Sequence, residues 1–211
     1  SLIGVREGFA QLRSMRVLGS FSVPAAGIET PLEILKVSPN RFVVRTTMGE
    51  GIEVLQGFDG HTAWSVRSGV GARILAGAER EALVKQADFF GDLHDLTQFR
   101  DVATTADTTF EGRRAWQVRY VRGTPDTLYE FFDQELGLSL GNRVVLRSAF
   151  VRVEVRTLVG DYRVFGPLRL ATTIIQRQEG VETIIRIGFV EFDRVRDADV
   201  TLPEQVRALI P

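Results

Sequence analysis

Apolar and polar residues alternate with a period of two along most of this 211-residue chain, and that period predicts β-strands. The cleanest alternation is that of Val151, Val153 and Val155, which are separated by Arg and Glu residues as in a half-buried strand. The other segments that predict strands lie at 32–37, 42–48, 64–66, 73–75, 116–121, 128–133, 170–176 and 184–192. Turn residues separate these segments, among them Pro39-Asn40, Asp59-Gly60 and Gly166-Pro167.

Two longer segments depart from this period and predict helices. Apolar residues recur at spacings of three and four near the start of the chain, so we expect an N-terminal helix over residues 2–14. A second helix is predicted from about residue 78 to 93, where Leu83, Val84 and Ala87 form one apolar stripe. Because Phe89 adds apolar surface beside that stripe, this helix is expected to cover something on more than one side.

Roughly ten strands joined by tight turns predict a mainly β fold with some α, in which one antiparallel sheet curves around the helices. The chain shows no internal repeat, no low-complexity stretch and no linker long enough to separate two domains. We therefore expect residues 1–211 to form a single domain, with a short helix after Pro203 at its end.

Composition then removes several classes of function. The chain has 26 basic and 27 acidic residues, for a net charge of −1, which disfavours nucleic acid as a partner. It has no cysteine, which excludes thiol chemistry, disulfides and iron–sulfur ligation. No run approaches the ~20 apolar residues that a membrane-spanning helix needs, so we expect a chain that is not membrane-spanning.

The only cluster of metal-ligand residue types is Asp88, Asp92, His94 and Asp95, at the end of the second predicted helix. Asp88 and Asp92 share a helix face, but a zinc site needs three or four ligands in fixed geometry and no second histidine lies nearby. A solvated helix end explains the same residues, so no metal site is predicted.

His61 lies two residues after Asp59, which invites a general-base interpretation. The turn at Asp59-Gly60 already explains the aspartate, and no nucleophile is implied by the spacing. A hydrolase that uses His61 or the Asp88–Asp95 cluster stays an alternative. The sequence predicts no catalytic residue and no cofactor.

Aromatic residues give the better indication, because phenylalanine occurs 14 times. Core packing explains most of these side chains. The functional alternative is an apolar cavity under a curved sheet, closed by helices, with room for an acyl or isoprenoid chain. The residues predicted to line it, each of which could equally belong to the core, are Phe42, Trp64, Phe89, Phe90, Trp116, Val118 and Phe131.

Several short motifs resemble the outer-membrane lipoprotein-sorting (LolA-like) superfamily, and in particular an uncharacterised bacterial branch of it. They are Val37-Ser38-Pro39-Asn40-Arg41-Phe42, Gly57-Phe58-Asp59-Gly60 with Ala63-Trp64, Phe131-Phe132-Asp133 with Gly137-Leu138, Asp161-Tyr162-Arg163 with Phe165-Gly166, and Val200-Thr201-Leu202-Pro203. The similarity extends over nearly the whole chain from about Gly19. These motifs are mostly turns, so they are more specific for the fold than for a function.

The resemblance implies an incomplete antiparallel barrel, an open half-barrel whose concave apolar face is covered by helices that act as a lid. The second predicted helix lies where a lid element is expected. In the periplasmic carriers of this superfamily, the cavity holds lipoprotein acyl chains, and an arginine immediately before Pro-Asn fastens the lid. This chain has Ser38 at that position. A hydrophobic ligand is therefore expected without the carriers' own lid contact.

The function expected from these observations is that of an extracytoplasmic, periplasmic, non-enzymatic binding protein for a lipid or a lipoprotein acyl chain. The alternative is an accessory domain that serves a cell-envelope complex or a peptidase without a ligand of its own. The expected partners are accordingly a hydrophobic ligand and, in the alternative, an envelope protein.

Overall fold

The computed structural model describes residues 11–48, 51–89, 91, 99–121, 127–147 and 152–210 of the chain. Its first six strands are β1 (Ser14–Val23), β2 (Ile28–Val37), β3 (Arg41–Met48), β4 (Ile52–Phe58), β5 (Ala63–Arg67) and β6 (Gly71–Ile74). The later strands are β7 (Asp101–Phe110), β8 (Arg113–Val121), β9 (Thr127–Asp133), β10 (Ser139–Arg147), β11 (Arg152–Gly160), β12 (Arg163–Phe165), β13 (Leu168–Leu170), β14 (Thr173–Gln178) and β15 (Val181–Phe192). The helical segments are η1 (Pro24–Ala26), α2 (Gly77–Ala87), η5 (Asp197–Val200) and α3 (Glu204–Arg207).

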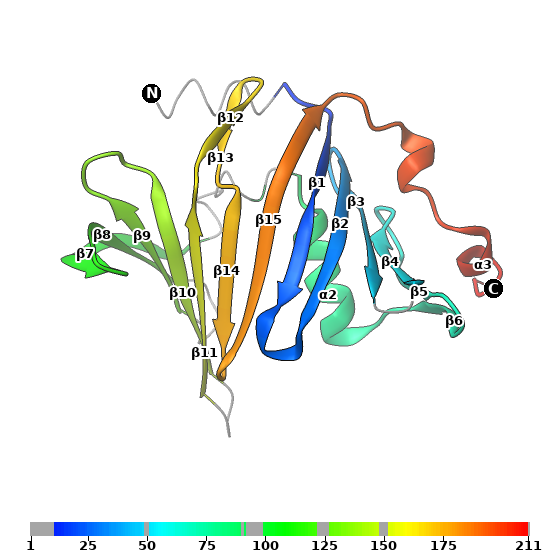
Figure 1. Cartoon of the computed structure of the whole chain (residues 1–211), viewed down its shortest axis with the longest axis horizontal. Helices are drawn as coiled ribbons and strands as arrows, with labels where there is room; N and C mark the ends of the chain where they lie inside the picture. Colours follow the sequence, from blue (N-terminus) through cyan, green and yellow to red (C-terminus); the bar gives the residue numbers. More distant parts are fainter. Residues whose placement is uncertain are drawn as a thin grey trace.

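Thirteen of the described strands form one antiparallel sheet, and β12 and β13 form a separate hairpin. The order in the large sheet is β6-β5-β4-β3-β2-β1-β15-β14-β11-β10-β9-β8-β7, so the first and last strands of the chain meet in its middle. Figure 1 shows this sheet curving around α2 without closing into a barrel. The predicted fold class, a single curved antiparallel sheet around helical elements, is confirmed.

Two glycines mark irregularities that bend the sheet. The pairing of β1 with β15 shifts register between Leu18 and Gly19, and the pairing of β10 with β9 shifts between Ser139 and Gly141. A Cβ atom at Gly19 or Gly141 would collide with a carbonyl oxygen of the neighbouring strand. Only glycine allows that approach, and bulges of this kind increase local twist and bending.

The two faces of the sheet bury different parts of the chain. On the inner face, α2 packs on β3, β4 and β5. The residues of this covered region are Phe42, Phe58, Ala63, Leu75, Leu83 and Ala87, all at most 4% exposed. On the outer face, the segment that contains η5 and α3 packs Val200 and Val206 against Trp64, and both valines are fully buried.

The helix α2 is shorter than the sequence predicts. It begins at Gly77 and ends at Ala87, whereas the apolar stripe predicts a helix to about residue 93. Asp88 leaves the helical conformation with a ψ of 111°, and the Phe89 N–H donates to the Pro39 carbonyl at 3.0 Å. Hydrogen bonding to the β2–β3 turn therefore replaces continuation of the helix.

The N-terminal helix predicted over residues 2–14 falls largely outside the described residues. Its predicted end is wrong, because residues 11–13 are not helical and Ser14 already begins β1. The predicted short helix after Pro203 is confirmed as α3. Among the residues that the structure describes, no helix is both long and apolar enough to span a membrane.

Candidate binding surface on the inner face of the sheet

Cross-strand pairing shows which residues share the inner face with α2. Val17 of β1 lies opposite Ile34, which packs in the covered region, and opposite Val190 of β15. Four residues after Val17 on β1, Phe21 faces the same side and lies opposite Ile185, beyond the register shift at Gly19. From Ile185 the pairing leads through Ile174 to Val159 of β11. Because side chains alternate along each strand, this path fixes the inner-face residues of β8 to β11 and β14.

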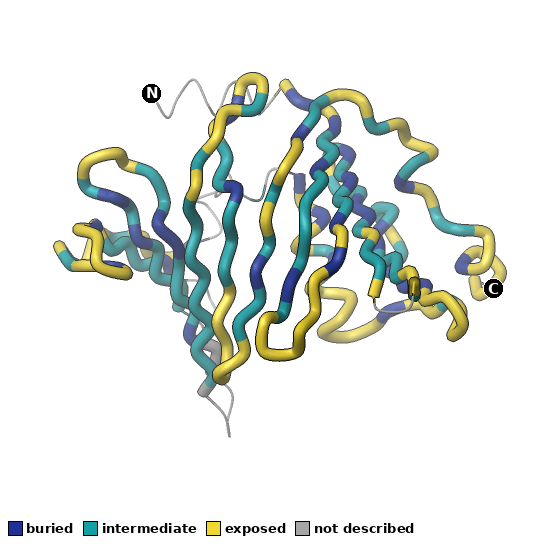
Figure 2. The backbone as a smooth tube through the Cα atoms, viewed as in Figure 1, coloured by how far each residue is buried: buried dark blue, intermediate teal, exposed yellow. Residues whose placement is uncertain are grey.

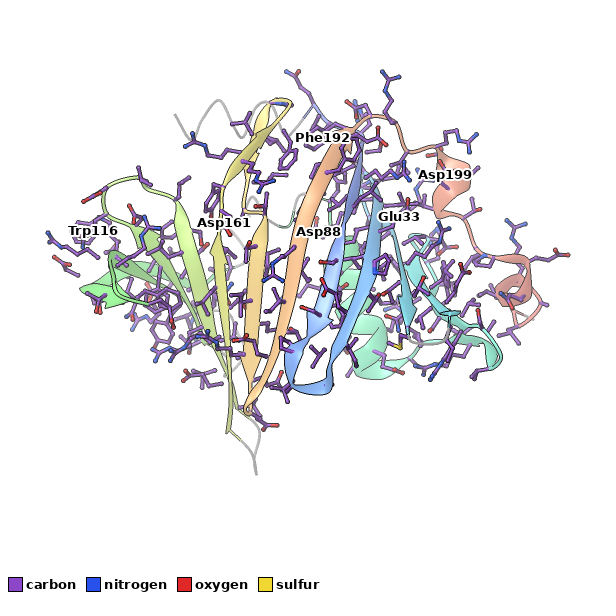
Figure 3. The ribbon with its side chains drawn as sticks, in the orientation of Figure 1. Glu33, Asp88, Trp116, Asp161, Phe192 and Asp199 are labelled. Atoms are coloured by element: carbon purple, nitrogen blue, oxygen red, sulfur yellow. The ribbon has the colours of Figure 1, made fainter. Side chains whose placement is uncertain are left out.

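Beyond β1, the inner face carries several apolar side chains that are only half-buried. We call these residues the open surface: Val118, Leu128, Phe132, Val144, Val155, Val159, Ile174 and Ile185. Figure 2 shows this intermediate burial along β11 and in the first half of β14. At the margin of this surface, near the β7 edge, the Trp116 side chain is 45% exposed and is labelled in Figure 3. Exposed apolar surface is often found at binding sites.

A cross-strand row of polar side chains, formed by Glu130, Asn142, Thr157 and Gln176, crosses the open surface. Glu130 of β9 lies opposite Val118 and Asn142, and the Ser139 hydroxyl donates to Glu130 Oε1 at 3.3 Å. Burial, the charge of Glu130 and a hydrogen bond with it raise the pKa of Tyr120 to about 12. Burial and the same charge raise the pKa of Tyr162. Both phenols therefore stay protonated at neutral pH.

The sequence-predicted pocket residues do not come together in one place. Phe42 and Phe89 lie on the side of α2 but are 3% and 1% exposed, and they pack in two different core clusters. Trp64 and Phe131 face the opposite side of the sheet. Trp64 packs under the C-terminal segment, and Phe131 stacks on Phe110 with ring centroids 4.2 Å apart.

Two of the predicted residues belong to the inner face near the β7 edge. Val118 is part of the open surface, and Trp116 lies at its margin, two residues before it on β8. Phe90 lies outside the described residues. That all seven residues line one pocket stays a prediction. Among those described, only Trp116 and Val118 lie side by side on the inner face.

Sequence reasoning missed most of the open surface because its members are ordinary strand valines, leucines and isoleucines. Val144 lies in β10, a strand that the alternation does not predict. Val155 and Ile174 lie in predicted strands, but alternation alone does not tell which face is concave. The usable signal is the alternation in β11, where Val153 and Val155 share the inner face and Glu154 takes the outer one.

The two arginines near the β2–β3 turn, Arg41 and Arg45, pair with acidic side chains on the outer side of the sheet. Arg45 projects to the outer face, where it binds Glu33 at 2.7 Å, and Arg41 binds Asp197 at 2.7 Å. On the inner side, the Lys36 Nζ donates to the Asp88 carbonyl at 3.4 Å, just after α2. The end of α2 is thus fastened by Lys36 and by the backbone of the turn.

Of the residues considered for catalysis or metal binding, Asp59 has a structural role in a turn. The Asp59 carboxylate accepts the backbone N–H groups of His61 and Thr62 at 2.9 and 2.7 Å, which forms the turn between β4 and β5. Asp92, His94 and Asp95 lie outside the described residues. The described part of the chain holds no group of three His, Cys, Asp or Glu residues placed to bind a metal.

A groove of about 530 Å³ lies on the other side of the sheet, beside α3. Its lining is mixed, with polar Glu53, Arg67 and Gln205 beside apolar Leu55 and Val66. The charged side chains make it a poorer match for an acyl chain than an apolar surface would be. The inner face is the better candidate for an apolar ligand.

The structure is similar to solved structures of proteins of very different sequence. A domain from Vibrio parahaemolyticus described as an outer membrane lipoprotein-sorting protein domain superposes with a TM-score of 0.63 at 11% identity, over 92% of both chains. A DUF1329 family protein from Desulfovibrio piger gives 0.65 at 10% identity, over 93% of this chain and 92% of the other. A LolA superfamily protein from Nitrosomonas europaea gives 0.61 at 10% identity, over 96% and 97%.

No family model matches the sequence, and no curated protein matches it significantly. The relationship is therefore one of architecture, carried by the curved open sheet and by the helix on its inner face. On this evidence the chain has a LolA-like fold.

Proposed function

We propose that the chain is an extracytoplasmic, non-enzymatic carrier that holds a lipid or a lipoprotein acyl chain against the open surface. The observation that carries this proposal is the open surface itself, a group of half-buried apolar side chains on six strands of the inner face. The description of one similar structure as a lipoprotein-sorting domain, and of another as a LolA superfamily protein, supports a periplasmic setting.

The energetics suit a carrier that binds and releases. Each methylene removed from water contributes about 0.8 kcal/mol, so about ten methylenes contribute about 8 kcal/mol before the costs of ordering the ligand. The interaction needs no directional partner and no covalent step. An extended chain lying across several strands is the ligand shape that this surface fits.

A neutral fluorescent probe, N-phenyl-1-naphthylamine, tests the proposal directly. We expect its fluorescence to rise on binding the wild-type protein, and Val155→Asn to weaken binding about tenfold, because an amide in the open surface must lose water when the probe binds. The matched control is Val164→Asn, since Val164 lies in the β12–β13 hairpin and is 67% exposed. Equal binding by the Val155 variant would contradict the proposed location.

Material purified from a bacterial envelope gives the second readout. Native mass spectrometry followed by organic extraction should release a lipid from the wild-type protein and less from the Val155 variant. If neither probe nor lipid binds, and a protein partner survives purification instead, the alternative role as an accessory domain of an envelope complex takes precedence.

A further inference from the structure

Polar side chains form a straight line across the strands in the middle of the inner face. The registers place five of them directly opposite one another on β9, β10, β11, β14 and β15, and we call them the polar row: Glu130, Asn142, Thr157, Gln176 and Thr183. Neighbouring strands lie about 4.8 Å apart. A ligand that lies along the polar row therefore meets a new polar side chain at each such interval.

Most of these side chains have hydrogen-bonding groups that are available to a ligand. Asn142, Thr157 and Thr183 are half-buried, and Gln176 is exposed. Within the described part of the chain, no protein group hydrogen bonds to the side chains of Asn142, Thr157 or Gln176. Amides and hydroxyls both donate and accept, and they carry no charge. A ligand that covers them must replace the water that they lose, because an unpaired polar group is costly to bury.

Apolar side chains of the open surface flank the polar row on both sides, two residues away along each strand. On one side they are Leu128, Val144 and Val155, and on the other they are Val159, Ile174 and Ile185. A ligand that follows the polar row therefore needs polar groups at regular intervals and apolar surface beside them. A hydrocarbon chain in the same place supplies only the apolar surface.

A chain of pyranose sugars has this composition. The hydroxyl groups lie along the edges of each ring and both donate and accept, whereas the C–H groups form its apolar faces. In a β-1,4-linked chain the rings extend in a line, and one ring is about as long as the spacing between neighbouring strands. An extended peptide matches that spacing less well, because its residues advance by about 3.3 Å and its side chains alternate in direction.

We propose that the inner face binds a linear β-1,4-linked oligosaccharide, which extends along the polar row from β9 toward β15. The sugar hydroxyls hydrogen bond to Asn142, Thr157 and Gln176, and the flanking apolar side chains contact the C–H groups of the rings. This inference goes beyond the carrier function, because it gives the polar row a ligand of a different chemical class from an acyl chain.

Isothermal titration calorimetry with two tetrasaccharides of glucose tests the proposal. Cellotetraose, which is β-1,4-linked and extended, should bind with a Kd on the order of 0.1–1 mM, and maltotetraose, which is α-1,4-linked and curved, should bind at least about fivefold more weakly. Thr157→Val and Asn142→Leu remove hydrogen-bonding groups with little change in volume, and each should weaken cellotetraose binding about fivefold. Both variants should still bind N-phenyl-1-naphthylamine at least as tightly as the wild type, because each adds apolar surface.

The matched control is Thr127→Val, which makes the same change on the outer face of β9, one residue before Leu128. It should bind cellotetraose as the wild type does. Equal binding of the two tetrasaccharides, or cellotetraose binding that both inner-face variants retain while circular dichroism shows them folded, overturns the proposal. If the wild-type protein binds the fluorescent probe but not cellotetraose, the oligosaccharide site is overturned and the carrier function stands. Binding of cellotetraose without binding of the probe contradicts the carrier function instead.

Discussion

The inner face of the sheet has two regions. Both are built from strands in which apolar and polar residues alternate, but their apolar side chains are buried to different extents. In the covered region, α2 adds Leu83 and Ala87 to the strand residues, and exposure falls to between 0 and 4%. In the open surface, the apolar strand residues remain half-buried among the described residues. The covered region is therefore a packed hydrophobic core, whereas the open surface leaves apolar area that a ligand could cover.

The largest expected effect compares one phenylalanine from each region. Phe58→Ala should lower the free energy of unfolding by about 4 kcal/mol, because Phe58 is 3% exposed and its removal leaves a cavity under α2. Phe132→Ala should cost only about 1–2 kcal/mol, because the half-buried ring loses less surface and water fills its place. Urea unfolding of both variants measures this. Equal losses would show that the open surface is packed as tightly as the covered region.

A smaller effect concerns the two tryptophans, which report separately on the two sides of the sheet. Trp64 is 1% exposed in the outer core, and Trp116 is 45% exposed beside the open surface. We expect acrylamide to quench the Trp64→Phe variant, which keeps Trp116, several times more strongly than the Trp116→Phe variant. A bound alkyl ligand should protect Trp116 alone. Protection of Trp64 by the ligand would place binding on the outer face instead.

The sequence predicted the type of structure better than it predicted the site. Alternation at Val153 and Val155 placed β11 correctly, and turn chemistry at Asp59-Gly60 correctly separated β4 from β5. The strand β7 was missed because its sequence, DVATTADTTF, is rich in threonine and lacks apolar alternation. The physical cause is that an edge strand buries few of its side chains, so its sequence needs few apolar residues at alternating positions.

The site was harder to predict because aromatic character does not indicate a face. Trp64 and Phe58 both lie near the β4–β5 turn, yet they pack on opposite sides of the sheet. Shifting the alternation along a strand by one residue moves a side chain to the other face of the sheet. Register shifts like those at Gly19 and Gly141 cause such a change. Only the three-dimensional pairing shows that Glu130 and Val118 share a surface while Phe131 does not.

Two of the strands under the open surface, β9 and β10, are joined by a turn that a carboxylate holds. At the end of β9, the Asp133 carboxylate accepts the N–H groups of Leu136 and Glu135 at 2.7 and 3.0 Å and binds Arg113 at 2.6 Å. These hydrogen bonds, the one from Leu136 above all, and the arginine hold the pKa of Asp133 below its usual value. Acid should therefore loosen this hairpin before it loosens the apolar core under α2.

The smallest expected effect follows from the sign of that shift. A carboxyl with a lowered pKa contributes stability at every pH above its unfolded value, about 4, and loses it as the pH falls through the lower folded value. The urea concentration at the unfolding midpoint should thus be higher for the wild-type protein than for Asp133→Asn at pH 7. This difference in midpoint should shrink as the pH is lowered from about 4. Asp59→Asn, the same change in a turn of the covered region, is the reference. A gap that does not depend on pH would mean that the hydrogen-bond geometry of Asp133, and not its charge, stabilises the hairpin beneath the open surface.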